Sequence, residues 1–132
     1  MSIAENIAQV RANIEAAAQE AGRDPKEITL VGASKMNDAA ACREAIAAGI
    51  DVLGENRVQE MIQKLSEHAY DGAPLHFIGH LQRNKVKQVV GHVDLIHLHG
   101  LSYKEAYRLF LTASVIFYRL WISCNNIFNS LS

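Results

Sequence analysis

The sequence lacks several patterns that mark particular classes of protein. It has only two cysteines, Cys42 and Cys124, and no CxxC spacing, so it predicts neither a disulfide framework nor a thiolate metal site. No GxGxxG turn follows its first apolar run, which argues against a dinucleotide-binding sheet. Its net charge of -1 gives no electrostatic reason to expect nucleic acid or an anionic membrane as a partner.

The N-terminus also lacks a long apolar segment. The first residues, MSIAENIAQVRANIEAAAQEAG, contain acids and no continuous apolar run, so they are typical of neither a signal peptide nor a transit peptide. We therefore expect a cytoplasmic protein with reduced cysteines. The 132 residues, 49% hydrophobic and 20% charged, suffice for one compact domain and are too few for two ordinary ones.

The chain is predicted to begin with an amphipathic helix. Apolar residues recur at the spacing of one helical face, at Ile3, Ile7, Val10 and Ile14. Ser2 and Glu5 fit the capping-box pattern, and Gly22 is a natural stop. The helix is expected to run from about Ile3 to Ala21.

Four short apolar runs then alternate with helix-like segments. The runs are ITLVGAS (28–34), DVLGEN (51–56), LHFIGHL (75–81) and VDLIHLH (93–99). The segments between them are DAAACREAIAAG, NRVQEMIQKLSEHA and NKVKQVVG. Continuous apolar strands joined by short helical crossovers predict an α/β fold with parallel strands covered by helices.

The spacing of these runs, at intervals of roughly twenty residues, favours a (β/α)8 barrel of the TIM type. A doubly wound sheet is the alternative. A complete barrel needs about 200 residues or more, so about four βα units predict only its first half. A half barrel leaves two edge strands unpaired, which predicts self-association through these edges.

The composition changes near Gly100. Seven of the nine aromatic residues and only four charged residues follow it. The apolar run LFLTASVIFYRLWI is interrupted by Arg119 and is shorter than the ~20 residues that a membrane-spanning helix needs. We therefore divide the chain into a half barrel, residues 1–99, and an atypical tail, residues 100–132. The tail could form a buried helix, an interfacial helix, or no structure shared with the rest.

Lys35 stands where the first apolar run ends. In parallel α/β folds the carboxyl ends of the strands form the mouth where ligands bind. Apolar surroundings would desolvate a lysine there and leave a neutral amine, able to form a Schiff base with an aldehyde or ketone. The alternative is an ordinary solvated loop lysine.

Polar residues follow the next two strands as well. Asn56, His80 and Gln82 supply hydrogen-bond donors and acceptors that could orient a polar ring. Gly54 and Gly79 permit close backbone approach at the same places. Converging strand exits of this kind make a ligand site at the mouth the favoured hypothesis.

Three motifs, LVGASK, LGENRVQE and HFIGHLQRNKVK, resemble in order and spacing those of the pyridoxal phosphate homeostasis proteins. That family is similar to the N-terminal barrel of alanine racemase, and the resemblance covers residues 1 to about 97. It implies that Lys35 holds pyridoxal 5'-phosphate (PLP) as an internal aldimine, with Asn56 and His80 around the cofactor. It also implies a protein that binds and buffers PLP for PLP-dependent enzymes, without turnover of its own.

The sequence departs from this family after VDLIH. In the family, a serine-containing loop and an R-x-G-x-x-x-F-G-like segment bind the PLP phosphate, and residues 98–132 contain neither. The tail is therefore interpreted as the product of a shifted reading frame or a truncated gene. Without those charge-assisted hydrogen bonds, we expect weak PLP binding.

Three other functions were weighed. A Schiff-base enzyme of the racemase, decarboxylase or aldolase kind would need a second proton-transfer group, which the sequence does not identify. A fragment that binds partners through its tail and strand edges would need no cofactor. The histidine pairs His76 with His80 and His97 with His99 could bind a metal, but no orienting acid or HExxH motif accompanies them, and no metal site is predicted.

Overall fold

The computed structural model describes residues 1–97 and 121–124. Its helices are α1 (Ile3–Glu20), α2 (Ala39–Ala47), α3 (Val58–Ser66) and α4 (Val86–Val89), with short 3₁₀ helices η1 (Pro25–Glu27) and η2 (Arg83–Lys85). Its strands are β1 (Thr29–Ala33), β2 (Val52–Glu55), β3 (Leu75–Phe77), β4 (Leu95–Ile96) and β5 (Trp121–Cys124). Each predicted apolar run contains one of β1 to β4, and each helix-like segment contains one of α2 to α4.

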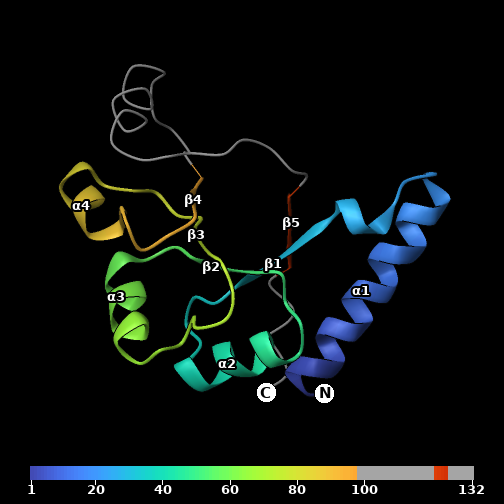
Figure 1. Ribbon diagram of the computed structural model, residues 1–132, viewed down its shortest axis with the longest axis horizontal. Coiled ribbons are helices and arrows are strands. Elements are labelled where there is room, and N and C mark those ends of the chain that lie inside the picture. Colours follow the sequence, from blue (N-terminus) through green and yellow to red (C-terminus); the bar gives the residue numbers. More distant parts are fainter. Residues whose placement is uncertain (98–120, 125–132) are drawn as a thin grey trace.

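The strands of this part form one parallel sheet in the order β4-β3-β2-β1-β5. From β1 to β4 the order follows the sequence without reversal, as in one arc of a barrel, whereas a doubly wound sheet reverses its direction. Figure 1 shows the α-helices in an arc outside the strands. The predicted α/β class, with four parallel strands, is confirmed.

One edge of the sheet differs from the prediction. Strand β5, from the tail, pairs in parallel with β1 along its whole length, from Thr29 opposite Trp121 to Gly32 opposite Cys124. The expectation that this edge of β1 would be unpaired is therefore wrong. A closed barrel pairs its first strand with its last, and β5 takes that side of β1. The end of the fourth apolar run, VDLIHLH, including His99, lies outside the described residues.

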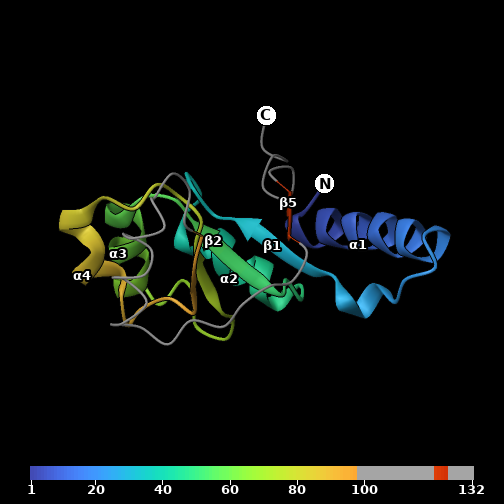
Figure 2. The ribbon, with the colours of Figure 1, turned by 90° about the horizontal axis from the view of Figure 1, so that it is seen from above.

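Helix α1 begins with the predicted capping box. The Glu5 backbone N–H donates to Ser2 Oγ at 3.1 Å, and the Ser2 N–H donates to Glu5 Oε2 at 2.7 Å, which satisfies two of the free donors at the helix start. The helix extends past the β5 end of the sheet, while α3 and α4 lie at the other end (Figure 2). Among the described residues, no helix combines the length and apolar character needed to cross a membrane.

The core lies between the sheet and its helices. Alternate strand residues point to this side. The core joins the strand residues Leu30, Leu53, Leu75 and Phe77 to Cys42 and Ala45 of α2 and to Val58 and Met61 of α3. Fully burying an aliphatic or aromatic side chain of this size contributes about 1.5–3 kcal/mol, so this layer holds the helices on one face of the sheet.

Two aspartates fix the starts of the strands. Asp51 Oδ2 accepts the Leu30 N–H at 2.7 Å, and Asp94 Oδ2 accepts the Leu75 N–H at 2.9 Å. Each carboxylate thus satisfies a backbone donor on the neighbouring strand. Asp51 Oδ1 also pairs with Arg11 of α1 at 2.8 Å, which ties the first helix to the same end of the sheet. The opposite, carboxyl end is left for the site.

Candidate functional site

The ladder of the sheet continues for one residue past the ends of β1 and β3. The Ser34 N–H donates to Gly54 O at 2.8 Å, and the Ile78 N–H donates to Glu55 O at 2.8 Å. Ser34 and Glu55 are both buried and in contact through their side chains. The residue that follows each of them is therefore delivered to the carboxyl edge of the sheet, on adjacent strand exits.

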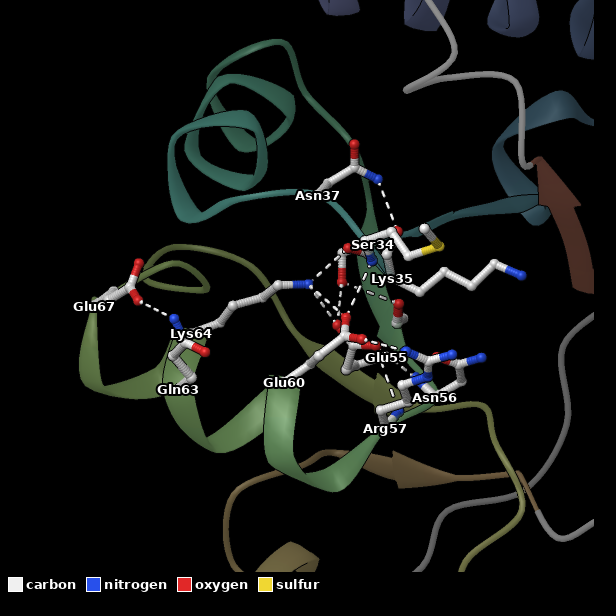
Figure 3. Close-up of polar contacts among 12 residues, drawn as sticks. Ser34, Lys35, Asn37, Glu55, Asn56, Arg57, Glu60, Gln63, Lys64 and Glu67 are labelled. Atoms are coloured by element: carbon white, nitrogen blue, oxygen red, sulfur yellow. Dashed lines mark hydrogen bonds and ion pairs between the residues drawn. The ribbon is translucent and has the colours of Figure 1, made fainter.

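Lys35 is one of these two residues. Figure 3 shows its side chain extending away from Glu55 and from Lys64, which reaches toward Glu55 from α3. The whole residue is exposed. The prediction that apolar surroundings would desolvate this amine is therefore wrong for the chain as it stands, because the loop after β1 places the side chain in solvent.

Asn56 follows Glu55 and is the second residue delivered to this edge of the sheet. It is half-buried. Its backbone N–H donates to Glu55 Oε1 at 2.8 Å. Its side-chain Oδ1 is buried, and none of the described residues donates a hydrogen bond to it. A buried acceptor without a donor costs about 1–3 kcal/mol, which makes this oxygen a candidate ligand contact.

The exit of β3 packs directly on Asn56. A Cβ added to Gly79 would lie 2.3 Å from Asn56 O and 2.7 Å from Asn56 Cα, so only glycine permits this approach. His80 follows immediately and is exposed. The structure thus places Lys35, Asn56 and His80 on neighbouring strand exits at one edge of the sheet, while Gln82 is exposed before η2.

A buried polar cluster lies beneath these exits, and its pairing was missed by the sequence analysis. Lys64 Nζ donates to Glu55 Oε2 and to Ser34 O, each at 2.7 Å. Ser34 Oγ lies 3.3 Å and the Tyr70 hydroxyl 3.4 Å from the same carboxylate oxygen. Glu55 is fully buried, and Lys64 is nearly so.

The sequence contained a faint signal for this ion pair. Lys64 falls at helical spacing with Val58 and Met61, on the face of α3 that is buried. A lysine on that face needs a buried anion, and Glu55 ends an otherwise apolar run.

The titratable neighbours of this cluster are held neutral. Burial raises the pKa of the Tyr70 phenol, and the Glu55 charge raises it further. Burial likewise raises the pKa of the Cys42 thiol, which lies in the core. The cluster therefore fixes the strand exits and offers no ready proton donor or nucleophile to a ligand.

A histidine pair lies on the sheet at β3 and β4. His97 Nε2 is 3.3 Å from His76 Nδ1, with the ring centroids 5.4 Å apart. The pKa of His76 is lowered to about 4, chiefly by burial and secondly by the charge of His97, while Asp94 opposes the shift. Within residues 1–97 and 121–124, no group of three or more His, Cys, Asp or Glu side chains could hold a metal.

The His76 pKa predicts a loss of stability in acid. The folded pKa of about 4 lies below the ordinary 6.5, so the unfolded chain binds the proton first. The contribution of neutral His76 to the free energy of unfolding is fully present above about pH 6.5. It is lost as the pH drops toward about 4, and the loss is about 1–2 kcal/mol after allowing for partial exposure. Urea unfolding at pH 7 and pH 4.5 measures this loss, which should be smaller in His76→Gln. An equal loss in both proteins would contradict the assignment.

Comparison with known proteins identifies the first three quarters of the chain. No protein-family model matches it. It is 48% identical over 96 residues to the pyridoxal phosphate homeostasis protein of Pseudomonas aeruginosa, covering 73% of this chain. It is 49% identical over 98 residues to that of Escherichia coli K12, covering 72% of this chain. The chain belongs to the pyridoxal phosphate homeostasis protein family.

Solved structures of the pyridoxal phosphate homeostasis family carry the same architecture. PipY of Synechococcus elongatus, solved with PLP bound, superposes with a TM-score of 0.68 at 38% identity, over 84% of this chain and 48% of PipY. PipY solved without PLP gives the same TM-score and identity. The chain spans 42% of the length of the Pseudomonas and Escherichia relatives, so it matches one part of a longer protein.

Proposed function

We propose that this chain binds PLP covalently through Lys35, as a binding protein and not as an enzyme. The observation that carries the proposal is the pairing of two features on adjacent strand exits. Lys35 offers an accessible primary amine, and Asn56 offers a buried acceptor with no donor among the described residues. PLP contains both an aldehyde for an amine and ring groups that can donate a hydrogen bond, so the residues present fit it.

The bound cofactor would supply an aldehyde carbon that a primary amine can attack. Lys35 Nζ must first lose a proton to solvent, because only the neutral amine has a free electron pair. The neutral amine would then replace the aldehyde oxygen, which would leave as water together with the two hydrogens of the amine. Asn56 would orient the ring through its Oδ1, and His80, exposed at the next exit, is proposed to line the same mouth.

Binding without turnover is supported by the burial of the acidic side chains near the strand exits. Glu55 and Tyr70, acids close to the strand exits, are buried in the cluster with Lys64, on the side away from Lys35. Catalysis at a PLP carbon needs a proton-transfer group that reaches the reacting atom. We therefore propose a cytoplasmic PLP carrier that exchanges its cofactor with PLP-dependent enzymes.

The test is covalent trapping. We expect PLP followed by borohydride to give a pyridoxyl adduct that peptide mass spectrometry places on Lys35, and we expect Lys35→Ala to lose at least nine tenths of it, because the amine itself is the reacting group. Lys26→Ala is the matched control, since Lys26 is also an exposed lysine. An adduct of equal yield in Lys35→Ala, or none in the unmodified chain, would refute the proposal.

A further inference from the structure

Two side chains of α3 hold the peptide groups on either side of Lys35. Lys64 Nζ donates to Ser34 O, the carbonyl just before Lys35, at 2.7 Å. Glu60 Oε2 accepts the N–H of Met36, the residue just after it, at 3.0 Å. One turn of helix therefore clamps the backbone of Lys35 from both sides, while its side chain stays in solvent (Figure 3).

Met36 adopts a conformation that its own side chain does not explain. Its φ of 61° lies in the left-handed region, which costs a non-glycine residue energy. The side chain is 83% exposed, so no packing offsets that cost. The Asn37 N–H closes this turn on Ser34 O at 3.1 Å, and the hydrogen bond to Glu60 adds a contact from a later helix that holds Met36 in this conformation.

Glu60 is itself well fixed. Arg57 donates to its other oxygen, Oε1, at 3.1 Å, and Lys64 Nζ lies 3.7 Å from Oε2. The Met36 N–H, more than these two cations, lowers the pKa of the Glu60 carboxyl, so the carboxylate is ionised at neutral pH. A charged acceptor gives a stronger hydrogen bond to a backbone donor than a neutral one does.

We propose that Glu60 is a positioning residue for Lys35, and this inference rests on the proposed function. By holding the left-handed turn at Met36, Glu60 sets the direction in which Lys35 leaves the sheet and keeps its amine on the side of Asn56. A preorganised amine reacts with a bound aldehyde faster than one on a loose loop, because less conformational freedom is lost on reaction. Glu60 touches no ligand and acts only through the backbone.

The experiment compares Glu60→Ala, Glu60→Gln and a control, Glu67→Ala, an exposed glutamate at the end of the same helix. Each protein is labelled at Lys35 with PLP and borohydride, and separately with formaldehyde and borohydride, which needs only an accessible amine. Hydrogen exchange of the Met36 amide, measured without any aldehyde, reports on the clamp directly.

We expect Glu60→Ala to slow PLP labelling of Lys35 about tenfold, because a hydrogen bond to a charged group is lost. Formaldehyde labelling should be unchanged. The Met36 amide should lose its protection from hydrogen exchange. Glu60→Gln keeps an acceptor oxygen and should restore most of the rate and the protection. PLP labelling of Glu60→Ala at the rate of the unmodified chain would overturn the positioning role alone. An unmodified chain labelled by formaldehyde but not by PLP would overturn the proposed function, whatever the Met36 amide shows.

Discussion

Replacing Glu55 by glutamine is expected to lower the free energy of unfolding by about 3 kcal/mol. The change leaves the Lys64 ammonium buried and without its principal counter-ion, 2.7 Å away. Glu60, at 3.7 Å and partly exposed, compensates only in part. Urea unfolding of the full chain at pH 7, followed by far-UV circular dichroism, measures the difference.

A double variant separates the charge from the packing. Glu55→Gln combined with Lys64→Met removes both charges and keeps similar volumes, so it should recover most of the lost stability, since a buried pair contributes little against well-packed neutral side chains. Two results would show that the cluster does not hold the strand exits together. One is a free energy of unfolding of Glu55→Gln within about 1 kcal/mol of that of the unmodified chain. The other is a double variant that is no more stable than Glu55→Gln.

Gly79→Ala should be nearly as damaging, at about 3 kcal/mol, the upper part of the range for an overpacked site. The added Cβ would meet the backbone of Asn56 at 2.3 Å, and a backbone atom directly after β2 cannot move aside cheaply. We expect the exits of β2 and β3 to separate, which also moves Asn56 from the mouth. The same urea experiment gives the stability, and the Asn56 amide shift in a heteronuclear spectrum gives the displacement.

Gly32→Ala is the matched control for Gly79→Ala. Gly32 lies in β1, and a Cβ there meets the side chains of Ile50 and Leu53, at 3.3 Å or more. Side chains can adjust by a few tenths of an ångström, so a loss of no more than about 1 kcal/mol is expected. Equal losses in the two variants would mean that the loss of a glycine in itself, and not the contact with Asn56, sets the cost.

The fold was largely predictable because its signals are local. A continuous apolar run is enough to predict a buried parallel strand, and Ser2 with Glu5 is enough to predict where α1 begins. Strand β5 was not predictable in this way. Its pairing with β1 joins segments far apart in the sequence, and no periodicity within Trp121–Cys124 specifies which edge of the sheet it meets.

The position of the site was predictable from the sequence, but the contacts that hold its residues in place were not. Lys35 and Asn56 follow apolar strands directly, and the carboxyl ends of parallel strands lie at one edge. The exposure of Lys35 depends on the turn at Met36, and that turn is held in part by a hydrogen bond to Glu60 of a later helix. Contacts of this kind are tertiary, so charged residues such as Glu60 and Lys64 were indistinguishable from ordinary surface charges.

At the exits of β1 and β2, a residue of the buried cluster is followed directly by a proposed ligand contact. Ser34 precedes Lys35 after β1, and Glu55 precedes Asn56 at the end of β2. A one-residue deletion inside β2 would shift this phase and exchange the two roles. The carboxylate would then turn to the mouth, while the amide would face the stranded ammonium of Lys64. Gaps of a single codon in Val52–Glu55 should therefore be far less tolerated than gaps of the same size in the loop before Asp51.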